Sequence, residues 1–119
     1  MHELSIVASI VDTVTESVAA YPGARVQEVR LRVGALASVG VESLEFCWRI
    51  ATEGTALEGS KLVVKTLPVV MRCETCGDVE LDGVQSFRCP TCGELCGDLR
   101  QGRELEIDSI EIEDGEEAA

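Results

Sequence analysis

Cys73-Glu-Thr-Cys76 and Cys89-Pro-Thr-Cys92 are the two stretches of sequence that decide the fold of this chain. Twelve residues separate Cys76 from Cys89, and a glycine follows each pair. Two intervening residues let both thiolates of a pair reach one metal ion at about 2.3 Å. The following glycine suits a tight turn, because positive φ costs little only for glycine. The spacing therefore predicts one tetrahedral site made by four cysteines.

The segment between the two pairs predicts a β-hairpin. Asp82-Gly83 is a dipeptide that two-residue hairpin turns prefer, and short alternating arms flank it at 79–81 and 84–87. Two cysteine turns joined by a hairpin describe a zinc ribbon. A segment this small cannot be held by apolar contacts alone, so we expect the metal to supply its stability. Two disulfides, or unrelated free thiols, are the alternatives.

The charge of the chain argues against nucleic-acid binding. The 119 residues include 10 basic and 22 acidic side chains, a net charge of −12. Eight of the acids lie from Glu104 onward, where there is no Lys or Arg. Duplex binding requires a basic face that displaces counterions. We therefore expect this zinc ribbon not to bind nucleic acid.

The N-terminus predicts no targeting segment. Met1-His2-Glu3 lacks the basic start of a signal peptide, and no apolar run approaches 18 residues. We therefore expect no membrane span. Paired cysteines with metal spacing and no export signal indicate the cytoplasm.

The segments that flank the cysteine motifs predict an α+β fold, with two helices on a small, mainly antiparallel three-stranded sheet and the zinc ribbon inserted as a module. The helices are expected at 3–20 and 41–53, and the strands at 26–33, 61–67 and 104–112. The predicted domains are an α+β domain (1–68 and 102–113), a zinc-ribbon domain (69–101) and a disordered acidic tail (114–119).

Both predicted helices carry an apolar stripe that we expect to face the core. The stripe of the first helix consists of Leu4, Val7, Ile10, Val11, Val14 and Val18. The stripe of the second helix consists of Val41, Leu44, Cys47, Trp48 and Ala51. On this pattern Cys47 is a buried structural thiol and Trp48 is a core residue. In the first strand Val29, Leu31 and Val33 share one face, with charged residues on the other.

The sequence shows no catalytic apparatus, so we expect no enzyme. It contains no Ser/His/Asp set and no glycine-rich phosphate loop, and its only histidine is His2. Four thiolates close a tetrahedral zinc site and leave no position for water, which makes the site structural. Cys96 is a spare thiol that could exchange into this site, although an unligated role is favoured.

His2 is the residue whose position suggests a second metal. At an arbitrary position it would be read as a solvated side chain on a frayed terminus. At position 2, the α-amine of Met1, the deprotonated amide nitrogen of His2 and a ring nitrogen of His2 can form adjoining chelate rings. Glu3, or a side chain from elsewhere, could complete the set. In-plane nitrogen donors favour Ni(II) or Cu(II).

Several segments of the chain are informative in combination. They are MHELSIV at 1–7, RVGAL at 32–36, VESLEFCW at 41–48, the two cysteine motifs, and ELEIDSIEIE at 104–113. Together they resemble the HypA/HybF family of nickel metallochaperones for [NiFe]-hydrogenase maturation, and the resemblance covers essentially the whole chain.

The resemblance implies the metal ligands. Nickel would be bound by Met1, His2 and Glu3, and zinc would be bound structurally by Cys73, Cys76, Cys89 and Cys92. Some members add a carboxylate near the start of the second helix. Here Gly40 lies in that neighbourhood, and Glu42 is the nearest acid.

The resemblance also implies the partners. These are the GTPase HypB and the [NiFe]-hydrogenase large subunit, with urease maturation proteins for some members. A monomer or a homodimer is expected.

Two other functional classes fit part of the sequence. Iron on four thiolates in paired motifs is the rubredoxin arrangement, which would make the chain an electron carrier. Its low aromatic content of 3% and its large α+β part count against that class. A zinc-ribbon adaptor without a nickel site is the other alternative, and in it His2 would be incidental.

Overall fold

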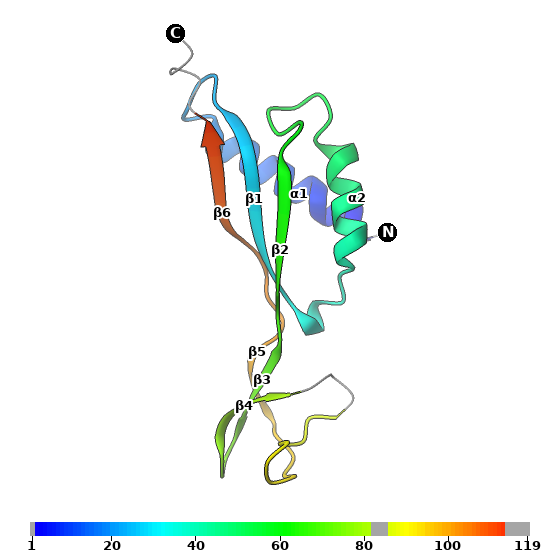
Figure 1. Cartoon of the computed structure of the whole chain (residues 1–119), viewed down its shortest axis with the longest axis vertical. Coiled ribbons are helices and arrows are strands. Elements are labelled where there is room, and N and C mark those ends of the chain that lie inside the picture. Colours follow the sequence, from blue (N-terminus) through cyan, green and yellow to red (C-terminus); the bar gives the residue numbers. More distant parts are fainter. Residues whose placement is uncertain (1, 82–85, 114–119) are drawn as a thin grey trace. The chain divides into compact units, whose positions relative to one another are not determined.

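A computed structural model describes residues 2–81 and 86–113 of the chain (Figure 1). Its elements are α1 (His2–Val18), β1 (Arg25–Gly34), the 3-10 helix η1 (Ala35–Ala37), α2 (Val41–Ala51), β2 (Lys61–Leu67), β3 (Val69–Cys73), β4 (Gly77–Leu81), β5 (Asp98–Gln101) and β6 (Leu105–Glu113). The two predicted helices and the three predicted strands are all present. Among the described residues, no helix is long and apolar enough to cross a membrane.

The contacts divide the chain into two compact units. The first unit contains 1–31, 39–64 and the chain from 107 onward, and the second contains 32–38 and 65–106. The predicted domain boundaries at 68/69 and 101/102 stay a prediction. The predicted acidic tail (114–119) and the predicted turn at Asp82-Gly83 lie outside the described residues.

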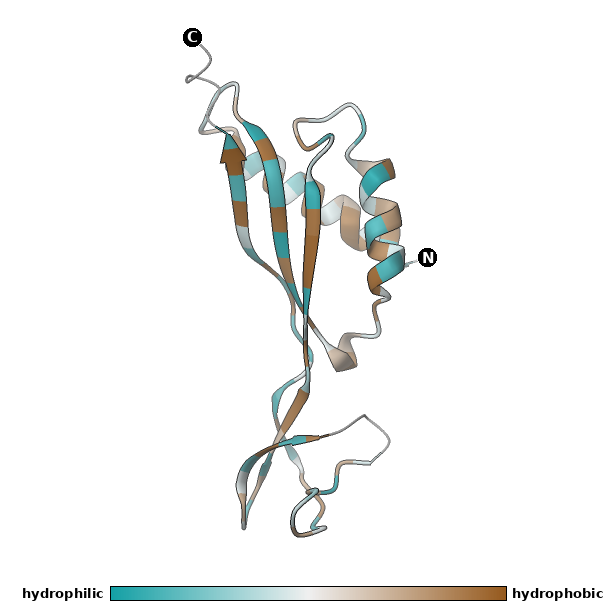
Figure 2. Cartoon of the chain, in the orientation of Figure 1, coloured by the Kyte–Doolittle hydropathy of each residue, from teal (hydrophilic) through white to brown (hydrophobic). Residues whose placement is uncertain are grey.

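β1 is the central strand of a three-stranded sheet with the order β2-β1-β6. The predicted alternation of β1 is confirmed, since Val29, Leu31 and Val33 are all buried. Figure 2 shows the resulting apolar and polar bands along β1 and β6. On the polar face the guanidinium of Arg30 forms ion pairs with Glu28 (2.6 Å) and Glu111 (2.8 Å). The sheet therefore has one apolar face available for the helices.

α1 and α2 pack against each other in the first unit, and Figure 1 shows α1 crossing behind the β2-β1-β6 sheet. The buried apolar residues of the helices are Val7, Val11, Val14, Val18, Leu44 and Trp48. Trp48 is a core residue as predicted, and its indole Nε1 donates a hydrogen bond to Ser60 Oγ at 3.0 Å. Two predictions are wrong: Leu4 is 40% exposed, and Cys47 is only half-buried.

The second unit contains a second three-stranded sheet, with the order β4-β3-β5, which the sequence patterns do not predict. β3 pairs antiparallel with β4, with Cys73 opposite Gly77, and antiparallel with β5. The predicted arm 79–81 thus pairs with β3. The first cysteine motif itself forms the turn of this hairpin. The structure therefore has two small sheets where one was expected.

The core of the second unit is partly made of cysteines. Its buried cluster consists of Val69, Met71, Cys73, Leu81, Cys89 and Cys96. Half of these six residues carry a thiol, so three larger apolar side chains make up the rest of this buried cluster. The metal expected from the sequence would therefore bind at the core itself.

Gly34 marks a close approach of two backbone segments in the second unit. Its N–H donates to the Glu104 carbonyl at 2.7 Å, and the Leu36 N–H donates to the Gly102 carbonyl at 2.7 Å. A Cβ atom at position 34 would overlap the backbone of Gly102 and would lie 2.7 Å from the Arg103 nitrogen. Backbone cannot move aside as a flexible side chain can, so glycine is required here for steric reasons.

Replacing Gly34 with Ala should therefore destabilise the protein by about 1–3 kcal/mol, the usual cost of overpacking. Thermal unfolding of the zinc-loaded protein measures this. Gly97→Ala is the matched control, because a Cβ there would meet nothing within 4 Å. Equal melting temperatures for the two variants would contradict the steric argument.

Candidate metal sites

Four cysteines meet in the second unit as the sequence predicts. The sulfurs of Cys73, Cys76, Cys89 and Cys92 all lie within 4.8 Å of one another. A tetrahedron with metal–sulfur bonds of about 2.3 Å has sulfur–sulfur edges of about 3.8 Å. The Cys73 and Cys92 sulfurs are 3.5 Å apart. The cluster therefore fits a tetrahedral metal ion such as zinc.

Two tight turns bring these sulfurs together. Cys73 ends β3 and Cys76 precedes Gly77, whose φ of +86° lets the chain turn back into β4. In the second motif the Gly93 N–H donates to the Cys89 carbonyl at 2.9 Å, and Gly93 has a φ of +80°. Both glycines thus adopt the positive φ that the sequence predicts. Each motif presents its two sulfurs from one turn of backbone.

The electrostatics of the cluster favour a cation. Hydrogen bonds from the backbone of Cys92 and Thr91 lower the pKa of the Cys89 thiol to about 6. A backbone hydrogen bond from Glu94 lowers the pKa of Cys92, but desolvation and the neighbouring thiols outweigh it and raise that pKa to about 12. One thiolate thus forms readily, and its negative charge disfavours the ionisation of the neighbouring thiols. A divalent cation removes this repulsion and deprotonates coordinating thiols.

Glu94 is a residue of this site that sequence reasoning missed. Its carboxylate Oε1 accepts a hydrogen bond from Thr75 Oγ1 at 2.8 Å and lies 3.7 Å from the Cys92 sulfur. Its backbone carbonyl accepts from the Cys89 N–H at 2.8 Å. Glu94 therefore connects the first cysteine turn to the second. Its position directly after the second CxxCG motif is the only signal in the sequence.

Cys96 lies beside the cluster without belonging to it. It is 4% exposed, and its sulfur lies 3.8 Å from the Glu94 carbonyl oxygen. Desolvation by burial raises the pKa of its thiol. Among the described residues, the group of four sulfurs close enough to share one ion does not include Cys96. An unligated thiol is the simplest role for it.

The predicted nickel ligands lie at the start of α1. His2 is the first residue of this helix, and its Nε2 lies 3.8 Å from Glu3 Oε2. The same Glu3 oxygen accepts a hydrogen bond from the Gly40 N–H at 3.2 Å, at the N-cap of α2. This hydrogen bond, with the nearby His2 as a smaller cause, lowers the pKa of Glu3. Met1 lies outside the described residues.

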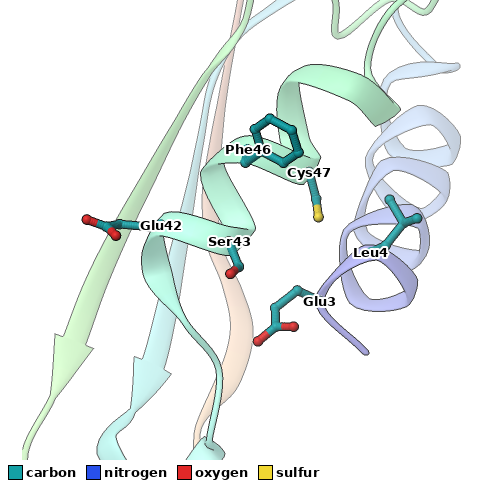
Figure 3. A pocket seen from close by; sticks show the side chains of 6 residues that line it. All are labelled: Glu3, Leu4, Glu42, Ser43, Phe46 and Cys47. Atoms are coloured by element: carbon teal, nitrogen blue, oxygen red, sulfur yellow. The ribbon is translucent and has the colours of Figure 1, made fainter. Parts of the chain in front are cut away.

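Glu42 is oriented differently from Glu3. Both residues line one pocket between α1 and α2, but Figure 3 shows the Glu42 carboxylate pointing away from the Glu3 carboxylate. Gly40 supplies a backbone N–H to Glu3 and no side chain. The structure thus brings His2 and Glu3 together but does not bring Glu42 to them.

The chain is similar to known proteins over nearly its whole length. The sequence model of the family described as "Hydrogenase/urease nickel incorporation, metallochaperone, hypA" matches residues 1–112. The hydrogenase maturation factor HypA of Chloroflexus aurantiacus is 43% identical over 112 residues, covering 93% of this chain and 98% of its own. The protein of the same name from a Roseiflexus species is 43% identical over 115 residues, covering 96% and 94%.

Two solved structures share the fold. The solution structure of the Ni metallochaperone HypA from Helicobacter pylori has a TM-score of 0.63 at 17% identity, covering 92% of this chain and 96% of that chain. A second HypA solution structure has a TM-score of 0.69 at 18% identity, covering 94% and 96%. The family match over nearly the whole chain, together with relatives that are 43% identical, shows that the chain belongs to the HypA family of nickel metallochaperones for hydrogenase maturation.

Proposed function

We propose that this chain binds Ni(II) at its N-terminus and delivers it to [NiFe]-hydrogenase during maturation. The observation that carries the proposal is the pairing of His2 with Glu3 at the first turn of α1, with 3.8 Å between Nε2 and Oε2. An imidazole nitrogen and a carboxylate oxygen at this separation can contact one ion. Family membership supports nickel as that ion.

The proposed nickel ligands come from three consecutive residues. The α-amine of Met1 and the amide and ring nitrogens of His2 would supply nitrogen donors in one plane, which Ni(II) prefers. Glu3 would supply an oxygen, or would hold the site in place through its hydrogen bond to the Gly40 N–H. The His2 side chain is 58% exposed, so an ion can enter and leave without opening the core.

The proposed zinc ligands are Cys73, Cys76, Cys89 and Cys92. Their sulfurs fit a tetrahedron, and a four-sulfur set leaves no open position for a reacting water. Zinc bound there would neutralise the thiolates and connect β3 to the second cysteine turn. We therefore assign it a structural role. Nickel transfer requires ligand exchange alone, so we propose a carrier and not an enzyme.

Delivery requires a site that holds nickel and can release it. The first turn of a helix opens locally at low free-energy cost, because its terminal residues make few contacts. His2 at the head of α1 satisfies that condition better than a buried cage would. The proposed partners are a HypB-type GTPase and the [NiFe]-hydrogenase large subunit, with urease maturation proteins as a further destination, and we place the delivery in the cytoplasm.

Nickel titration of tag-free protein that retains Met1 tests the proposal. Replacing His2 with Ala removes a ring-nitrogen donor and should weaken nickel binding by at least about 100-fold, since even losing an outer-shell partner of a metal site costs about 10–100-fold. Calorimetry measures the affinity, and total metal analysis counts zinc. One zinc is expected in both proteins.

The control variant is Asp12→Ala, an exposed acid of α1 away from the first turn. It should bind nickel as the wild type does. Equally weak nickel binding by wild type and His2→Ala, with one zinc in each, would leave His2 incidental and would favour the zinc-ribbon adaptor. A red protein containing iron would instead favour the electron carrier.

Nickel affinity should also fall as the pH decreases. Protons compete with nickel for an imidazole nitrogen, and a free imidazole protonates near pH about 6.5. Below that pH the nickel affinity should therefore drop by about tenfold per pH unit for each proton that nickel displaces. Because the Gly40 N–H lowers the pKa of Glu3, that carboxylate stays ionised in this range and does not contribute to the drop. Titrations at about pH 7.5 and about pH 5.5 measure the effect. A constant affinity would exclude His2 as a ligand.

The zinc assignment is tested by two thiol deletions in the same segment. Cys92→Ala removes a proposed ligand and should lose zinc together with the fold of the second unit. Cys96→Ala removes a buried thiol outside the group and should keep one zinc, with a loss in stability of about 1 kcal/mol. Metal analysis and circular dichroism report both. Loss of zinc from Cys96→Ala alone would make Cys96 the ligand.

A further inference from the structure

The helix pair of the first unit exposes large apolar side chains next to the start of α1. Phe46 and Ile50 of α2 are 64% and 56% exposed, and Leu4 of α1 is 40% exposed. Phe46 and Ile50 lie one helical turn apart and therefore share a face. Isolated exposed apolar residues are ordinary, but neighbouring ones mark an interaction surface.

Leu4 and Phe46 line a pocket with a volume of about 330 Å³. Its lining consists of Glu3, Leu4, Glu42, Ser43, Phe46 and Cys47. Figure 3 shows Leu4 on α1 across from Cys47 on α2, with Glu3 reaching toward Ser43 from the end of α1. The volume is at the lower end of about 300–1,000 Å³, the range of small-ligand sites. It suits one or two inserted side chains better than a cofactor.

The negative charge around this pocket indicates which kind of partner can bind there. Glu3 of α1 and Glu42 of α2 line the pocket, and Glu45 of α2 is exposed; we call these three residues the acidic rim. Arg49 is the one cation within α2. Such a rim is complementary to Lys or Arg. A symmetric contact between two copies of this chain would bring the same acidic rims together, in a chain of net charge −12. The rim therefore disfavours a second copy and favours a basic partner.

We propose that this face, comprising Leu4, Phe46, Ile50 and the pocket beside them, is the docking site for the protein that accepts nickel. The acceptor inserts an apolar side chain into the pocket and places flanking Lys or Arg residues against Glu42 and Glu45. The inference rests on the proposed function, because Glu3 belongs both to this pocket and to the proposed nickel site. Docking here brings the acceptor to the point where the ion leaves.

The test measures binding of the full-length, zinc-loaded chain to the purified large-subunit precursor of [NiFe]-hydrogenase. Phe46→Ala and Ile50→Ala should each weaken binding by at least about tenfold, as truncation of a buried interface anchor does. Nickel and zinc binding should stay at the wild-type level. Tyr21→Ala is the matched control, because Tyr21 is an aromatic residue that is 53% exposed outside this face.

Charge reversal tests the rim separately. Glu45→Lys should slow association and reduce its dependence on salt, whereas Asp12→Lys, an exposed acid of α1, should change both less. Cys47 can report on occupation of the pocket, since it lines the pocket, while Cys96 is buried and the other four cysteines are the proposed zinc ligands. Alkylation of Cys47 should slow when the acceptor binds.

Several results would overturn the docking site. Unchanged binding by Phe46→Ala and Ile50→Ala would do so, as would an equal loss in Tyr21→Ala. A wild-type dimer that Phe46→Ala dissociates would assign the face to a second copy. Loss of GTPase binding with acceptor binding retained would assign it to the GTPase. Failure of the nickel site is distinguished because it appears in the His2→Ala titration, which needs no acceptor.

Discussion

Repulsion between crowded thiolates is the constraint on which the second unit depends. Four sulfurs share a space in which no two are more than 4.8 Å apart, and desolvation together with the neighbouring thiols raises the pKa of Cys92 to about 12. Two of these cysteines, Cys73 and Cys89, are also part of the buried cluster. Zinc bound at the proposed site would therefore also complete the core of this unit.

The parts of the fold that could be predicted are those with strong local periodicity. β1 alternates from Glu28 to Val33 and α1 repeats valines at helical spacing, so their type and the face that they bury follow from the residues. β3 and β5 are only five and four residues long, and β5 (Asp-Leu-Arg-Gln) contains a single apolar residue. Their strand character comes from pairing with each other across the zinc segment. A local pattern does not carry that information.

The candidate metal sites also contain residues that local patterns predict and residues that they do not. The cysteine spacing and the N-terminal position of His2 can both be read from short stretches of sequence. The four-sulfur group and the candidate role of His2 could therefore be predicted. Glu94 contacts Thr75 across 19 residues of sequence, and Glu3 contacts Gly40 across 37, and no motif marks either pair. The exposure of Leu4 and the partial exposure of Cys47 were mispredicted for a related reason. An apolar stripe fixes which way a helix faces, but not how far its partner covers it.

The placement of His2 at the head of α1 has a further electrostatic consequence. The N–H groups of a helix's first turn have no acceptor within the helix and give that end a partial positive charge, which disfavours a nearby cation by about 0.3–1 kcal/mol. Nickel at this end would be bound against the helix dipole, with Glu3 as the acidic residue of the first turn that offsets it. An acceptor whose ligands lie away from a helix N-terminus has no such penalty. The direction of α1 alone would thus bias the ion toward leaving.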